Sequence, residues 1–155
     1  MTAFILILLL AAADQGVKFF VDKLMPEGRT IPLIAGFFHI TSVRNRGVAF
    51  GLMQGKAVLV TVITAAAIAL MVLHLIKNRK AQSFWERGGF ILITAGALGN
   101  LTDRLIRGYV VDMIDFRGIW VYVFNVADIW INLGVAFIII DFLLDACRKK
   151  RKKSS

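Results

Sequence analysis

Four long runs of apolar residues divide the chain, with few polar positions inside them. They cover residues 3–21, 57–76, 88–106 and 126–146. A helix needs about 20 consecutive apolar residues to cross the hydrocarbon core of a bilayer, and each run is close to that length. The pattern predicts an all-α membrane protein with four transmembrane helices. No soluble domain remains outside the runs, so residues 1–155 are expected to form a single integral membrane domain.

The segments between the runs have different patterns. Residues 22–56 and 107–125 are the two predicted outer loops. In the first, residues 31–43 contain Pro32, Gly36 and a partial alternation of apolar and polar positions, which predicts a small extracytoplasmic β-sheet at the membrane surface. The next stretch, Gly47–Leu52, predicts a short interfacial helix, with a plain loop as the alternative.

Composition and charge support the membrane class. The chain is 58% hydrophobic with a mean hydropathy of +0.73, which does not suit a soluble globule. A net charge of +9 could suggest a nucleic-acid partner. The cations are concentrated elsewhere, however: six lie in residues 148–153 and four in residues 77–87, at the ends of spans. By the positive-inside rule, the basic tail 147–155 and both termini are predicted to be cytoplasmic, and no nucleic acid is expected.

The first run is predicted to be a span rather than a cleaved signal peptide. It lacks a basic n-region, and its apolar character resumes beyond Asp14. The single cysteine, Cys147, cannot form an intramolecular disulfide and follows the last run.

Polar residues from three of the runs fall at one predicted depth: Asp14, Lys18, Asn100, Asp103, Arg104, Asn125 and Asp128. With ~1.5 Å of rise per residue, those of the first and third helices lie ~17 to 24 Å from the inner ends. The others begin the fourth helix at the same outer level. Unpaired ionisable groups in lipid are expensive, so this convergence predicts a functional site in the outer leaflet.

Carboxylates are the reactive groups available to this site. Asp112, in the second outer loop, and Asp128 could face each other, and such a pair could deprotonate water and protonate a carbonyl or an amine. The alternatives stay open from the residues alone. Asp112 could be a surface acid with Asp115 as its rival, Asp128 could be a helix-start acid favoured by the macrodipole, and Asp14 with Lys18 is interpreted as a structural ion pair.

The other polar residues are assigned structural roles. Asp141 and Asp145 lie at the inner end of the fourth run and are interpreted as anchoring partners of the basic tail. His74 and His39 lack companions for a metal site, so no metal is expected. The predicted site has no Cys or His and no defensible serine nucleophile motif, so covalent catalysis is unsupported.

The collected residues resemble those of the lipoprotein signal peptidase (signal peptidase II) family. Five segments occur in the family's order: ADQGVK, RNRGVAFG, GNLTDR, GYVVDMIDF and FNVAD. The resemblance spans nearly the whole chain. One departure is that the family often has a proline before the last motif, where this chain has Tyr122 and Val123.

The resemblance implies an aspartyl endopeptidase of the bacterial cytoplasmic (inner) membrane, active at the extracytoplasmic face. It would cleave signal peptides from prolipoproteins just before a diacylglyceryl-modified cysteine, with no cofactor. Asp112 and Asp128 fall on the catalytic positions. The positions implied to support the substrate or the dyad are Asn45, Asn100, Arg104 and Asn125. Asp14, Lys18 and Asp103 would be structural. A monomer in contact with membrane lipids, inhibited by cyclic peptides of the globomycin type, is expected.

Two readings from other classes remain at this stage. A small four-helix transporter could use Asp14 as a proton-coupled carboxylate, although it would not need the long first outer loop with its strand-like pattern. An assembly or lipid-binding module would tolerate exchange of Asp112 and Asp128 for asparagine.

Overall fold

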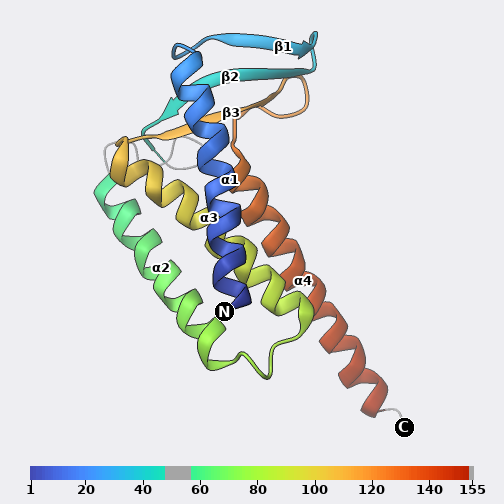
Figure 1. Cartoon of the computed structure of the whole chain (residues 1–155). Coiled ribbons are helices and arrows are strands. Elements are labelled where there is room, and N and C mark those ends of the chain that lie inside the picture. The colour runs from blue at the N-terminus through green and yellow to red at the C-terminus, as the bar shows by residue number, and fades with distance from the viewer. Residues whose placement is uncertain (48–56, 154–155) are drawn as a thin grey trace.

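A computed structural model gives the arrangement of the chain, and it describes residues 1–47 and 57–153. The elements, in chain order, are α1 (Thr2–Leu24), β1 (Thr30–Ile34), β2 (Phe38–Asn45), α2 (Ala57–Lys77), α3 (Phe84–Ile106), β3 (Val110–Phe116) and α4 (Val126–Lys153). The helices form a bundle with a small sheet across one end, while the N-terminus and the C-terminal end of α4 lie toward the other (Figure 1).

Three helices are long and apolar enough to cross a membrane, over Thr2–Leu24, Val58–Lys77 and Val126–Lys150. Most of the surface of these segments lies open on the outside of the bundle, as expected for helices that face lipid. The chain is therefore mostly helical, with apolar membrane helices and a small sheet. The remaining predicted span, residues 88–106, corresponds to α3. This helix is long enough to cross a membrane but is less apolar than the three segments above.

α3 is the most enclosed helix of the bundle, because it packs against α1, α2 and α4. A helix whose neighbours are protein can carry the polar side chains that a lipid-facing helix cannot. Glycines on both helices allow α4 to approach α3 closely. A Cβ added to Gly89 would lie 2.9 Å from the carbonyl oxygen of Gly134, and one added to Gly134 would lie 2.7 Å from that of Gly89. This contact is typical of membrane helix pairs.

The sheet is antiparallel with the strand order β1-β2-β3. The first two strands lie within residues 22–56, where the alternating pattern predicted a sheet. The third strand, β3, was missed, because Asp112 was expected in a loop. Its signal was present in the sequence, since Val110, Val111 and Ile114 are β-branched residues between Gly108 and Gly118, which both have positive φ.

Except for Gly47, the residues of the predicted interfacial helix (47–52) lie outside the described part of the chain.

Candidate active site

Asp112 is positioned by the pairing of β2 with β3. In this register Val43 lies opposite Asp112, and Asn45 lies opposite Val110. Asn45 and Asp112 are therefore diagonal neighbours across the strand pair. Asn45 Nδ2 donates to Asp112 Oδ2 at 2.9 Å, and Asn45 Oδ1 accepts from the backbone N–H of Gly47 at 2.9 Å. The strand register thus fixes one side of the Asp112 carboxyl group.

A backbone bridge brings the start of α4 to the same place. Ile114 donates its N–H to the carbonyl of Phe124 at 2.7 Å, and Phe124 donates back to Ile114 at 3.0 Å. The segment before α4 is thereby held two residues along the strand from Asp112. Asn125 and Asp128 then cap the helix reciprocally. Asp128 donates its backbone N–H to Asn125 Oδ1 and Asn125 donates its own to Asp128 Oδ2, both at 3.1 Å.

Asn125 is the residue that joins the two aspartates. Its Nδ2 donates to Asp112 Oδ1 at 2.6 Å, while its backbone N–H contacts Asp128. Asn100 contributes from α3, because its Nδ2 donates to Asp128 Oδ1 at 2.9 Å. Each carboxyl group therefore has both of its oxygens bound by N–H donors. The two groups are held together at the sheet end of the bundle.

The two aspartates have different environments. Asp112 is 3% exposed, and burial raises the pKa of its carboxyl group to about 6. The hydrogen bonds from Asn45 and Asn125 lower this pKa, and the nearby charge of Asp128 raises it. Asp128 is only partly buried. Asp112 is therefore suited to keep a proton, as a general acid must.

A buried lysine lies behind the pair. Lys18 and its two acidic partners are fully enclosed, with 0% exposure of each side chain. Lys18 Nζ lies 2.9 Å from Asp14 Oδ2, 3.2 Å from Asp103 Oδ2 and 2.8 Å from Asn100 Oδ1. An ammonium group has three N–H donors, so all of them are used. Polar residues of α1 and α3 are thereby joined.

The same buried acids hold the backbone next to each member of the pair. Asp14 Oδ1 accepts the N–H of Ala127 at 2.8 Å, and Asp103 Oδ2 accepts the N–H of Val111 at 3.1 Å. These two N–H groups belong to the residues directly before Asp128 and Asp112. Gly99 provides the room, because a Cβ at that position would collide with the carboxylate of Asp14.

Arg104 lies at the edge of the pair. Its guanidinium donates to the carbonyl oxygens of Asn100 at 3.3 Å and Gly47 at 3.4 Å, and its charge acts on both aspartates. Both bonds are long. A cation there can stabilise negative charge that develops on a bound carbonyl oxygen.

The structure brings together every residue that the sequence assigned to the site. It separates the rival acid, since Asp115 accepts from Thr41 Oγ1 at 2.6 Å and pairs with Arg117 at 3.2 Å. Two further residues were missed. Gln15 donates to Asp103 Oδ1 at 3.0 Å, and Arg107 pairs with the same oxygen. The sequence offered one signal for Arg107: it follows Asp103 by four residues, the spacing at which side chains on a helix can form an ion pair.

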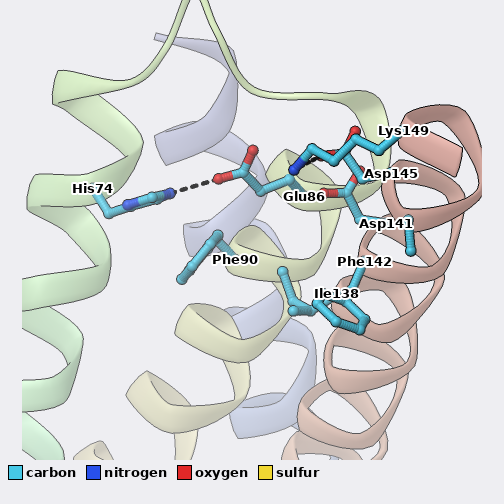
Figure 2. A pocket seen from close by; sticks show the side chains of 9 residues that line it. His74, Glu86, Phe90, Ile138, Asp141, Phe142, Asp145 and Lys149 are labelled. Atoms are coloured by element: carbon cyan, nitrogen blue, oxygen red, sulfur yellow. Dashed lines mark hydrogen bonds and ion pairs between the residues drawn. The ribbon is translucent and has the colours of Figure 1, made fainter. Parts of the chain in front are cut away.

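A second group of acids lies at the opposite end of the bundle, around a cavity of about 430 Å³. His74 Nε2 lies 2.8 Å from Glu86 Oε1, and Lys149 lies 3.5 Å from Asp145 (Figure 2). Asp141 accepts a hydrogen bond from Ser83 rather than pairing with the basic tail. Each acid has a partner, so these contacts join helix ends. No three His, Cys, Asp or Glu side chains in the described ranges are grouped to hold a metal ion.

An apolar helical bundle whose paired carboxyl groups lie beside a surface sheet has the architecture of a membrane aspartic peptidase. The family model of signal peptidase (SPase) II matches residues 6–144. The chain belongs to the signal peptidase II family.

Relatives support this assignment over nearly the full length. A lipoprotein signal peptidase of Fusobacterium nucleatum subsp. nucleatum is 51% identical over 148 residues, covering 96% of this chain and 89% of the relative. One from Clostridioides difficile is 44% identical over 136 residues, covering 88% and 90%. A solved structure described as a bacterial membrane enzyme, determined by the in meso method at 2.3 Å resolution, superposes with a TM-score of 0.87 at 35% identity, covering 96% of this chain and 91% of that chain.

The transporter alternative is not supported. Family membership indicates a peptidase. In addition, Asp14 is enclosed with Lys18 and the N–H of Ala127 and has no exposed surface for a transported solute or proton.

Proposed function

We propose that Asp112 and Asp128 are the catalytic dyad with which this signal peptidase II hydrolyses a peptide bond. The chain is an aspartic protease that removes signal peptides from prolipoproteins. The assignment of the dyad rests on the contacts of Asn125. Its side-chain amide donates to Asp112 and its backbone N–H donates to Asp128, so one residue binds both carboxyl groups. The residues assigned to support the dyad or the substrate are Asn45, Asn100, Arg104 and Asn125.

In the proposed reaction, Asp128 accepts a proton from a water molecule as that water attacks the scissile carbonyl carbon. Asp112 donates its proton to the carbonyl oxygen, which gives a tetrahedral intermediate. As this intermediate collapses, Asp128 passes the proton it took from water to the leaving amine, and Asp112 takes back a proton from a hydroxyl group of the intermediate. The raised pKa of Asp112 supports its role as the acid. These steps use carboxyl groups and water only.

The proposed substrate is a prolipoprotein that carries a diacylglyceryl-modified cysteine, cut just before that residue. The dyad lies at the sheet end of a bundle whose outer surface is apolar, with Phe19, Phe20 and Leu105 exposed near that end. Acyl chains would remain in the lipid while the peptide reaches the carboxyl groups. We further propose a monomer surrounded by membrane lipids, with cyclic peptides of the globomycin type as inhibitors.

The pH dependence of kcat/KM tests the role of Asp112. If the protonated form acts, kcat/KM falls as the pH rises through the pKa of about 6. The hydrogen bond from Asn45 favours the charged form and lowers this pKa. Asn45→Ala should therefore raise the pKa and move the alkaline limb to higher pH. Thr41→Val, on the same strand, removes a hydrogen bond to Asp115 and should leave the limb unchanged. An alkaline limb that stays in place or moves to lower pH in Asn45→Ala would refute the assignment.

For the topology, we propose four spans with α3 as the third, both termini in the cytoplasm of a bacterial inner membrane and the dyad at the extracytoplasmic face. The 23 residues of α3 reach ~34 Å at ~1.5 Å per residue, which suffices to span. The polar groups of its outer half have partners within the protein.

The single cysteine allows this topology to be tested, because Cys147 is exposed near the C-terminal end of α4. A membrane-impermeant maleimide should label Cys147 in inverted membrane vesicles but not in intact spheroplasts. The matched probe is Val121→Cys in a Cys147→Ala background, at a position that is 90% exposed beside the sheet. It should show the opposite preference. Labelling of both positions from one side would exclude the proposed topology.

A further inference from the structure

Lys18 occupies a place where it can act on the reaction without touching substrate. It has no exposed surface, and its ammonium group contacts Asn100 Oδ1 at 2.8 Å. The other end of the same amide, Asn100 Nδ2, donates to Asp128 Oδ1 at 2.9 Å. A continuous path of two hydrogen bonds therefore runs from a buried cation on α1, through α3, to one member of the proposed dyad.

The direction of these bonds follows from the donors alone. A side-chain amide has one accepting oxygen and one donating nitrogen, and a lysine ammonium can only donate. Asn100 must therefore turn its oxygen toward Lys18, and its nitrogen must face Asp128. The Asn100 oxygen also accepts from Asn125 Nδ2 at 3.2 Å, which favours the same orientation. With no ammonium at position 18, the amide would lose the shortest of the three hydrogen bonds that favour this orientation.

We propose that Lys18 is a positioning residue for the reaction: by fixing the orientation of Asn100, it keeps an N–H donor on Asp128 and so maintains Asp128 as the ionised general base. A reversed amide would present its oxygen to Asp128 and favour the protonated carboxyl group, which cannot accept a proton from water. The inference rests on the proposed dyad and goes beyond the structural role first assigned to Lys18.

The charged groups near this path are Asp14 and Lys18 on α1, Asp103 and Arg104 on α3, and Asp112 on β3. Removing Lys18 alone would leave two buried carboxylates without their shared cation, and the protein could fail to fold. It would also change the charge near Asp128. The double variant Asp14→Asn/Lys18→Met removes one charge of each sign and leaves Asp103 paired with Arg107.

The experiment compares this double variant with the wild-type chain, which carries the same net charge, while Asp14→Asn measures the contribution of position 14 alone. The kcat/KM of each protein is measured against pH with a diacylglyceryl-modified prolipoprotein in detergent, after thermal unfolding has shown that all three are folded. The acidic limb of the double variant should lie at least ~1 pH unit higher, equivalent to about a tenfold loss of activity below that limb. KM should change less than about twofold, because Lys18 is enclosed.

A second variant keeps Lys18 in place and removes the amide. Asn100→Leu, which changes no charge, should also move the acidic limb to higher pH. Overlapping profiles for the double variant and the wild-type chain, or a uniform loss of kcat at every pH, would overturn the inference, because both are expected of a purely structural lysine. Full activity of Asp128→Asn would instead refute the dyad itself, so the two failures are distinguishable.

Discussion

Replacing either Asp112 or Asp128 by asparagine should lower kcat for prolipoprotein cleavage by about 10³-fold or more, while the protein still folds. General acid–base catalysis contributes about 10² to 10⁴-fold per group, and an amide has the shape of a carboxyl group without its exchangeable proton. The variants are expected to fold because the amide oxygen of each new side chain still accepts one of the two N–H bonds made to the carboxyl group it replaces. The donor that keeps its bond is Asn125 in Asp112→Asn and Asn100 in Asp128→Asn.

The measurement is single-turnover cleavage of a diacylglyceryl-modified prolipoprotein in detergent, with thermal unfolding recorded on the same samples. Asp115→Asn is the matched control. It makes the same change three residues along β3, in a carboxylate that contacts Thr41 and Arg117 instead of the dyad. It should keep kcat within about twofold. Cleavage at a near wild-type rate by either dyad variant would mean that the dyad is wrongly assigned and would favour a docking module.

Asp14→Ala should affect stability far more than turnover. The substitution removes the 2.9 Å partner of a fully buried lysine and the acceptor of the Ala127 N–H. Breaking a buried ion pair from one side typically costs about 3–5 kcal/mol, because the other charge stays in an apolar environment. Lys18 keeps Asp103 and Asn100 as partners. The orientation of Asn100 is therefore retained, and kcat per folded molecule should stay within about threefold.

Unfolding in detergent, followed with rising denaturant, measures this loss. Asp22→Ala is the control on the same helix. The ion pairs of Asp22, with Arg44 at 3.3 Å and Arg107 at 3.8 Å, are partly exposed, and its carboxylate also accepts a hydrogen bond from the Tyr109 hydroxyl at 3.1 Å. Such pairs are typically worth about 1 kcal/mol or less. Wild-type stability of Asp14→Ala together with lost turnover would move Asp14 from the structural network into the chemistry.

Much of the fold was predictable because the hydrocarbon core of a bilayer restricts which segments can cross it. Apolar runs of spanning length indicate membrane helices whatever their neighbours are. The same constraint indicated the candidate site. Burying an ionisable residue such as Asp14 or Asp103 in a span costs much free energy unless the residue has a partner, so such residues point to a cluster. The third run was the exception. Its polar residues lower its hydropathy, and only the packing of α3 among three other helices explains how they are accommodated.

The sequence could not reveal how the dyad is assembled. Asp112 was expected in a loop, because the pattern of residues 110–116 was not assigned as a strand, and a strand is stabilised by partners distant in the chain. The pairing of Asn45 with Asp112 depends on the register of β2 with β3. The reciprocal cap between Asn125 and Asp128 was within reach of sequence reasoning, since a polar residue followed three positions later by an acid before an apolar run is a capping signature.

By itself, then, the sequence determined the membrane class, the order of the helices, the grouping of the polar residues at one level of the bundle and, by resemblance, the peptidase family. Those properties depend on residue type and on position along a helix, which are local. Only the tertiary structure decided which aspartate is buried, which donors hold each carboxyl group, and that Lys18 reaches Asp128 through Asn100. The contacts from Lys18 to Asn100, from Asn100 to Asp128 and from Asn45 to Asp112 join residues at least 28 positions apart. Their geometry depends on helix packing and strand register, which no local pattern specifies.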